Sequence, residues 1–137
     1  MLPVLADGAG LFSWDMVANR VCGDAEMARL VNVDVDELRA GVPVELIIGR
    51  MHVDDRERIA KALHSAIVNG TLYREVYRVA LADGEYCYVL CVARCFAYED
   101  GLPTSCAGFV CEAESIEGSP KLRPQDDGNV IQFRKPS

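Results

Sequence analysis

The sequence predicts an α+β domain in which strands form an antiparallel sheet and helices pack against it. Three observations predict this fold class. Residues 10–23 have the alternating pattern of two short strands around a turn, residues 55–68 have a helical pattern, and residues 72–113 alternate again, with two Asp-Gly turns among them. Strands and helices that are segregated along the chain in this way are typical of α+β folds.

The chain has 137 residues, a length typical of one domain. We expect an N-terminal segment over residues 1–9, a folded domain over residues 10–114 and a flexible tail over residues 115–137. The tail is rich in Pro, Gly, Ser and charged residues, which cannot build a core. Its short apolar stretch, residues 129–133, either pairs with a sheet edge or a partner or, as we favour, stays unstructured.

Composition and charge narrow the function. The net charge of −7 argues against nucleic-acid binding and against docking on an anionic membrane. The N-terminus lacks the regions of a signal peptide, and no apolar run approaches the roughly 20 residues of a membrane helix. We therefore expect a cytoplasmic protein whose six cysteines are free thiols, and none of these cysteines forms a Cys-x-x-Cys motif.

The first strand is predicted where Phe12, Trp14 and Met16 share one side and polar residues occupy the other. Asn19 is a turn residue, and residues 20–23 are expected to return as a second short strand. The two strands form the beginning of the sheet.

Helices are predicted between the two groups of strands. Several short ones are expected over residues 25–51, and the longest is expected over residues 55–68. Asp54 is expected as its N-cap, with Glu57 completing a capping box, and Gly70 ends it. One stripe of the long helix is apolar: Ile59, Ala62, Leu63, Ala66 and Ile67.

Three further strands are joined by tight turns at Asp83-Gly84 and Asp100-Gly101, which predicts an antiparallel meander. The middle strand is apolar on both sides, with Tyr86, Tyr88, Leu90, Val92 and Phe96 on one and Cys87, Val89, Cys91, Ala93 and Cys95 on the other. A sheet that is apolar on both faces needs two covers. Helices supply one, so we expect a second subunit or the N-terminal segment on the other.

Four segments resemble the PAS family of bacterial signalling modules: GLFSWDMVAN, MHVDDRERIAKALHSAI, VYRVALADGEYCYVL and YEDGLPTSCAGFV. They are similar to the family's opening strand with its Trp-Asp pair, its entry into the long helix, its Asp-Gly hairpin and its Gly-containing strand after a turn. The resemblance spans about residues 10–113. It implies a PAS-like five-stranded antiparallel sheet with short helices and one long connector helix packed on one face, and a non-catalytic sensory role.

The sequence departs from the family pattern at three places. Val53 stands where Pro is usual, Tyr88 stands where Trp is common, and Glu112-Ala113-Glu114 replaces the Asp-Ile-Thr ending. No kinase, cyclase or DNA-binding segment follows, so we expect a stand-alone module that does not pass a signal along its own chain in the usual way.

A ligand pocket is predicted between the sheet and the long helix. Its candidate residues are Trp14, Ile59, Leu63, Ile67, Tyr77 and Phe109. A packed core made of the same side chains is an equally good interpretation.

No bound cofactor is predicted. Some PAS members hold haem through a histidine on the long helix, but that position falls near Ile59, and His64 lies at the border of the apolar stripe. The Asn-Cys-Arg-Phe-Leu-Gln segment of photoreactive flavin members has no counterpart between residues 40 and 56. The resemblance therefore implies neither haem nor flavin.

His52, Asp54 and Asp55 form the one polar cluster that suggests a metal site or an acid–base pair. We favour the interpretation in which Asp54 caps the helix and both acids stabilise its positive N-terminal end. We therefore predict no metal site and no catalytic residue.

The cysteines of the middle strand cannot share a metal. Residues four apart on a strand are separated by about 13 Å, so no two of Cys87, Cys91 and Cys95 can ligate one zinc ion. A two-residue loop at Asp100-Gly101 would instead place Cys95 opposite Cys106 as a candidate redox pair. A longer loop would break this register, and two reduced thiols acting as small strand residues remain the favoured interpretation.

We expect a sensory module that binds a small apolar ligand or a partner protein, as a homodimer or hetero-complex through the sheet face. A heterodimerisation scaffold without ligand is the main alternative. A small cone-fold enzyme is weaker, because most acids fall in turns, caps or the tail. Glu75 is the nearest strand carboxylate, and we expect it to pair at the surface with its neighbours Arg74 and Arg78.

Overall fold

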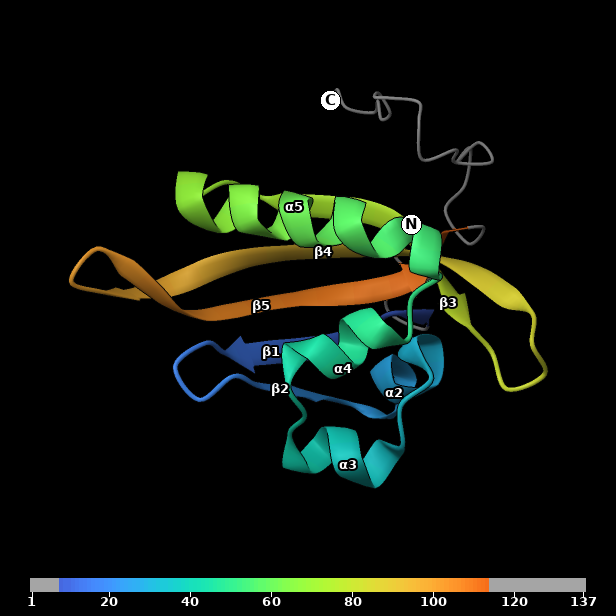
Figure 1. Cartoon of the computed structure of the whole chain (residues 1–137). Coiled ribbons are helices and arrows are strands. Elements are labelled where there is room, and N and C mark those ends of the chain that lie inside the picture. Colours follow the sequence, from blue (N-terminus) through green and yellow to red (C-terminus); the bar gives the residue numbers. More distant parts are fainter. Residues whose placement is uncertain (1–7, 114–137) are drawn as a thin grey trace.

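The computed structural model describes residues 8–113 (Figure 1). Residues 1–7 and 114–137 lie outside the described residues, so the predicted N-terminal segment 1–9 is described only at residues 8 and 9, and the predicted tail 115–137, with its apolar stretch 129–133, is not described. The elements follow the chain in this order: β1 (Gly10–Asp15), β2 (Arg20–Gly23), α2 (Ala25–Val31), α3 (Val35–Ala40), α4 (Val44–Gly49), α5 (Val53–Asn69), β3 (Tyr73–Ala80), β4 (Tyr86–Glu99) and β5 (Leu102–Glu112).

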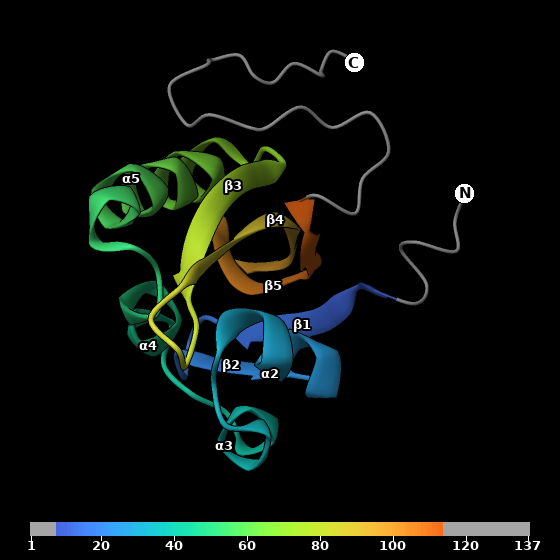
Figure 2. The ribbon, with the colours of Figure 1, turned by 90° about the vertical axis from the view of Figure 1, so that its right-hand side faces the viewer.

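The strands form one five-stranded antiparallel sheet in the order β2-β1-β5-β4-β3, which confirms the predicted α+β fold class. The central position of β5 brings the C-terminal strand beside the N-terminal one. Figure 2 shows the sheet curving around an interior that α4 and α5 border on the same side. No helix in the described range is long and apolar enough to cross a membrane.

Helix α5 begins earlier than predicted. His52 is the N-cap, and its Nδ1 accepts a hydrogen bond from the backbone N–H of Asp54 at 3.0 Å. The prediction that Asp54 caps the helix was therefore wrong, and Asp54 lies in the first turn. The C-terminal end is as predicted, because Gly70 has a left-handed φ of 66° that a residue with a side chain adopts at a cost.

The β4–β5 hairpin has the predicted tight turn, and of the two loop lengths that the sequence left open it has the two-residue loop. Asp100 and Gly101 both have positive φ, 55° and 79°, as the hairpin turn with the twist of the flanking strands requires. Glu99 therefore faces Leu102. Despite local register shifts near Ala97, the ladder continues into the rest of both strands.

The two faces of β4 have different surroundings. Cys91 and Ala93 are buried on the side that faces the helices, where they belong to one cluster with buried residues of the helices and of other strands. Val92 points to the opposite face, which none of the described helices α2–α5 covers and which is called the helix-free face below; it is half-buried there and faces Phe109 of β5. The predicted apolar character of both faces is therefore present, and helices α2–α5 cover one of them; the N-terminal segment expected as a possible cover of the other lies mostly outside the described residues.

Gly108 marks a close approach of two backbones. A Cβ atom at this position would lie 2.0 Å from the carbonyl oxygen of Val92 on the neighbouring strand. Only glycine fits there, because no real Cβ contact is that short.

Two short bridges connect the helical segment to the sheet edges. Val21 of β2 pairs with Val42, through hydrogen bonds in both directions at 2.6 and 2.9 Å. Met51 pairs with Val79 of β3. The residues on either side of α4 thus attach that helix to both edges of the sheet.

Candidate functional site

An apolar cavity of about 70 Å³ lies between the sheet and the helices. Side chains of β1, α4, α5 and the three later strands form most of its wall. Five of the six predicted pocket residues are among them: Trp14, Ile59, Leu63, Ile67 and Tyr77. Their role in binding a ligand stays a prediction.

Phe109 is the exception, because it does not line the cavity. Cys106 and Val110 of β5 line the cavity, and they lie three positions and one position from Phe109. Side chains at odd separations along a strand point to opposite sides of the sheet. Phe109 therefore points to the helix-free face, where the register places it opposite Leu11 and Val92. Its assignment to the pocket was wrong.

Other residues of the cavity wall were missed from the sequence. Helix α4 contributes Ile47 and Ile48, and Met51 follows it. The sequence predicted a helix here, but a helix of six residues is too short to show a periodic stripe. The pair of adjacent isoleucines directly before the long helix was the available signal.

The volume of the cavity limits what it can hold. A water molecule occupies about 30 Å³ of liquid, an engineered cavity of about 150 Å³ binds benzene, and drug-sized ligands occupy pockets of about 300–1,000 Å³. A cavity of about 70 Å³ suits a small apolar molecule. Haem and flavin are much larger than this space, Ile59 offers no ligand atom to a metal, and His64 is exposed.

The polar groups deep in the wall remain uncharged. Burial raises the pKa of the Tyr77 hydroxyl well above its ordinary value, and the hydrogen bond with Cys91 raises it further. Burial also raises the pKa of Cys91 to about 12, although its hydrogen bond with Tyr77 opposes the change. Both groups are therefore neutral near pH 7, and neither is an activated nucleophile or base.

Two cysteines of the cavity wall lie side by side. The register places Cys95 opposite Cys106, the arrangement expected for a two-residue loop at Asp100-Gly101, and their Sγ atoms are 2.7 Å apart. The sulfur of Met16 lies 3.5 Å from Cys106 Sγ. Burial, followed by the interaction with Cys95, raises the pKa of Cys106 to about 12. Redox activity of this pair stays a prediction.

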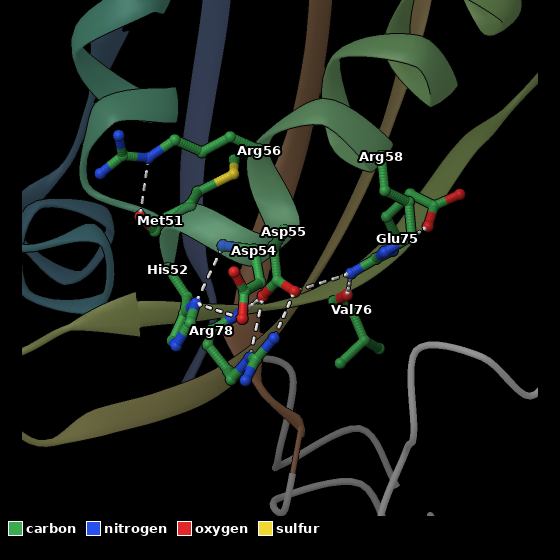
Figure 3. A network of polar contacts seen from close by, with 9 residues as sticks. All are labelled: Met51, His52, Asp54, Asp55, Arg56, Arg58, Glu75, Val76 and Arg78. Carbon is green, nitrogen blue, oxygen red and sulfur yellow. Dashed lines mark hydrogen bonds and ion pairs between the residues drawn. The ribbon is translucent and has the colours of Figure 1, made fainter.

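A network of charged residues fixes the start of α5 to β3 (Figure 3). Asp55 is 1% exposed and accepts hydrogen bonds from Arg78. Arg58 lies 3.7 Å from the same carboxylate and donates to Glu75 and to the carbonyl of Val76, both at 2.9 Å. Glu75 thus pairs with Arg58 of the long helix, which corrects the predicted pairing with Arg74 and Arg78.

The polar cluster around His52 has a structural arrangement. The His52 ring caps α5 and packs on Tyr86, with the ring centroids 4.6 Å apart, and Asp55 is engaged by Arg78. Among residues 8–113, no three His, Cys, Asp or Glu side chains gather as metal ligands. The contacts of His52, Asp54 and Asp55 thus agree with a role in positioning the helix.

Comparison with known proteins identifies the family. A sequence model described as PAS fold matches residues 21–110. The chain is similar to a sensory box histidine kinase/response regulator from Burkholderia thailandensis E264, with 21% identity over 81% of each chain and a TM-score of 0.67. It is also similar to the N-terminal domain of a diguanylate cyclase with PAS/PAC sensor from Marinobacter aquaeolei, with 18% identity over 76% of this chain and 94% of that one and a TM-score of 0.67.

A third similar structure is a LOV protein from Rhodobacter sphaeroides, with 15% identity over 80% of this chain and 62% of that one and a TM-score of 0.61. No curated protein sequence matches the chain. At these identities the solved structures establish the fold, and the family match extends over most of the described residues. The chain therefore belongs to the PAS family, whose members are sensory modules of signalling proteins.

Proposed function

We propose that this PAS domain is a non-catalytic sensory module that binds a small apolar ligand in the cavity between its sheet and helices. It passes the state of the cavity to a partner protein, or to a second copy of the chain, through the helix-free face of the sheet. The observation that carries the proposal is the apolar cavity of about 70 Å³, which borders helix α5 and the central strands at once.

The way α5 is held suggests how a ligand acts. Ion pairs of Asp55 and Arg58 fix its N-terminal part to β3, whereas Leu63, Ala66 and Ile67 border the cavity farther along the helix. The second half of the helix can occupy different positions, and a ligand can bind one of them more tightly than another. Such a ligand increases the population of the position that it binds more tightly, by an amount that the difference in affinity sets. The fixed end gives the movement a pivot.

The helix-free face supports the choice of output surface. It carries Leu11, which is 60% exposed, beside the half-buried Val92 and Phe109. These residues lie on three adjacent strands that include β5 and β4, whose opposite sides line the cavity. A partner covering this face buries apolar area and contacts the strands that sense the ligand.

Filling the cavity tests the proposal. Ala66 is buried in the wall, and Ala66→Leu adds about the volume that the cavity offers, at roughly three carbon atoms. Ala60→Leu places the same change on an exposed site of the same helix as the control. Xenon binding followed by ¹²⁹Xe NMR should be present in the wild type and in Ala60→Leu and lost in Ala66→Leu. Native mass spectrometry of the wild type should show a small bound molecule retained from the host.

The small size of the cavity favours one alternative, a scaffold that binds its partner without any ligand. Wild-type protein that binds no xenon and retains no small molecule, but captures the same partner as Ala66→Leu does, would establish the scaffold. Partner capture that depends on Ala66 and on bound ligand supports sensing instead.

A further inference from the structure

Cys95 and Cys106 bring two thiols together in the cavity wall. The residues face each other across β4 and β5, and their Sγ atoms are 2.7 Å apart. The Asp100-Gly101 turn closes a two-residue loop, and the two register shifts near Ala97 offset each other, so the backbone ladder places Cys95 opposite Cys106. The fold itself therefore brings the thiols together.

The sulfur separation favours a bond over a shared metal ion. Two thiolates that bind one zinc ion at about 2.3 Å in tetrahedral geometry are about 3.8 Å apart, whereas the sulfurs of a disulfide are about 2.05 Å apart. The observed 2.7 Å lies nearer the disulfide value. A metal between Cys95 and Cys106 would have to push the strands apart, whereas a bond needs a small approach of the side chains.

Other cysteines are not arranged in this way. Cys91 and Cys111 also lie on β4 and β5, but Cys91 faces the cavity, whereas Cys111 follows the inward-facing Val110 and points to the other side of the sheet. Cys111 is therefore a matched control, since it lies on the same strand as Cys106.

We propose that Cys95 and Cys106 are a reversible redox-modification site, which a hydroperoxide converts from two thiols to a disulfide within the cavity wall. Cys95 is the more accessible of the two and reacts first, whereas Cys106 is buried and resolves the intermediate. The high pKa of Cys106, about 12, keeps it protonated until that second step.

The steps balance in atoms and electrons. The sulfur of Cys95 attacks one oxygen of the hydroperoxide, the O–O bond breaks, and the proton of Cys95 leaves with the other oxygen as an alcohol or water, so that Cys95 becomes a sulfenic acid. Cys106 Sγ then attacks Cys95 Sγ, the S–O bond breaks, and the proton of Cys106 leaves with the hydroxyl as water. The two thiols lose two electrons and two protons, and the hydroperoxide gains both. A dithiol reductant reverses the change.

The modification would regulate the proposed ligand site, and this consequence rests on the proposed function. The bond joins β4 to β5 beside the register shift between Cys95 and Ala97, where the ladder is irregular. It also draws together two side chains that line the cavity. Oxidation therefore adds a covalent bond to a part of the wall where the backbone ladder is irregular.

Peptide mapping tests the bond directly. The folded full-length protein is treated with hydrogen peroxide, its free thiols are blocked, and it is digested without reductant by proteases that cut after Arg and Glu. Cleavage after Arg94, Glu99 and Glu112 yields peptides 95–99 and 100–112, which stay together only if a disulfide joins them. We expect the joined peptides, a fall from six titratable thiols to four, and restoration of six by a dithiol reductant.

Variants identify the partner sulfur. Cys111→Ser should retain the joined peptides, and Cys106→Ser should lose them. Separate peptides in the wild type, or joined peptides that survive Cys106→Ser and vanish in Cys111→Ser, would overturn the proposal. Xenon binding by Cys95→Ser tests the cavity separately, so that failure of the redox pair and failure of the ligand site are distinguished.

Discussion

The carboxylate of Asp55 accepts three hydrogen bonds from the single residue Arg78. The backbone N–H of Arg78 lies 2.9 Å from Oδ2, its Nε lies 3.1 Å from the same oxygen, and its Nη2 lies 2.7 Å from Oδ1. One buried side chain on the first turn of α5 thus binds both the main chain and the guanidinium of β3. This contact fixes the N-terminal end of α5. We propose that this end is the pivot when a ligand moves the rest of the helix.

Replacing Asp55 with Asn should destabilise the domain strongly. The amide keeps the shape of the side chain but leaves the guanidinium of Arg78 without its buried counter-charge. Removal of one partner of a buried ion pair costs about 3–5 kcal/mol, and because Arg78 remains a quarter exposed we expect about 2–3 kcal/mol. Urea denaturation measures the loss. Asp54→Asn on the same turn is exposed and should change stability by less than about 0.5 kcal/mol; equal losses in both variants would contradict the role of Asp55.

The same carboxylate predicts a dependence of stability on pH. Burial by itself would raise the pKa of Asp55, but the hydrogen bonds and charge of Arg78, with the charge of Arg58, lower it below the ordinary value. The stabilisation is therefore complete above the pKa of the unfolded chain, about 3.9, and is lost as pH falls through the lower folded value.

Denaturant midpoints measured from about pH 6 to about pH 3 test this sign. The wild type should lose stability toward acid more steeply than Asp55→Asn does. Glu75 acts in the opposite direction, because burial raises its pKa. The difference between wild type and variant is therefore the decisive quantity, and parallel pH curves would contradict the assignment.

Gly108→Ala should disrupt the sheet. Its Cβ would be placed 2.0 Å from the carbonyl oxygen of Val92 and 2.7 Å from the Cα of Ala93, so the strands must separate. We expect a loss of about 2 kcal/mol or more by thermal and urea unfolding. Gly49→Ala is the matched control, since a Cβ there meets nothing within 4 Å at the end of α4. A Gly108→Ala protein as stable as the control would show that the strands yield easily.

Val92→Glu should abolish association through the helix-free face. The carboxylate would be placed beside Phe109 on the proposed interface, where burial of an unpaired charge opposes binding. Light scattering over a range of concentrations should show a larger species for the wild type and for Val68→Glu, which carries the same change on an exposed site of α5. A wild type that is monomeric at high micromolar concentration would count against a homodimer through this face.

Local chemistry determined the parts of the fold that sequence reasoning predicted well. Asp100 and Gly101 tolerate positive φ, so the dipeptide indicated a tight turn, and the facing of Cys95 and Cys106 followed from the shorter of the two loop lengths considered. The apolar stripe of the long helix was equally informative, because Ile59 and Leu63 do line the interior.

Two features were harder to predict: which side of a strand faces the helices, and which residue caps a helix. The strand around Phe109 is apolar on both sides, so alternation alone could not indicate which side faces the helices. At the start of α5, Asp54 has the side chain that most often caps a helix. The tertiary hydrogen bond from His52 N–H to the carbonyl of Arg78 instead fixes His52 outside the helix, in the capping position.

The Asp55–Arg78 contact joins residues 23 positions apart and leaves no local pattern. One signal was nevertheless available in the sequence. Asp55 precedes Ile59 by four residues and therefore lies on the apolar stripe of the helix, where a charge requires a buried partner. Arg78, on the strand that follows the helix, supplies it.

Residues 42 and 50–58 contact the two edge strands of the sheet, and these contacts affect how copies of this domain can aggregate. An edge strand with unpaired backbone groups is a template for the strand of another molecule. On β3, the N–H and C=O of Arg78, the N–H of Ala80 and the C=O of Val76 are all taken by partners from residues 50–58.

On the opposite edge, Val21 of β2 exchanges both of its backbone hydrogen bonds with Val42. Each edge of the sheet is thus partly closed to strand addition by the domain's own chain. Edge-to-edge growth into fibrils is thereby opposed, which is consistent with association through the apolar face as we propose.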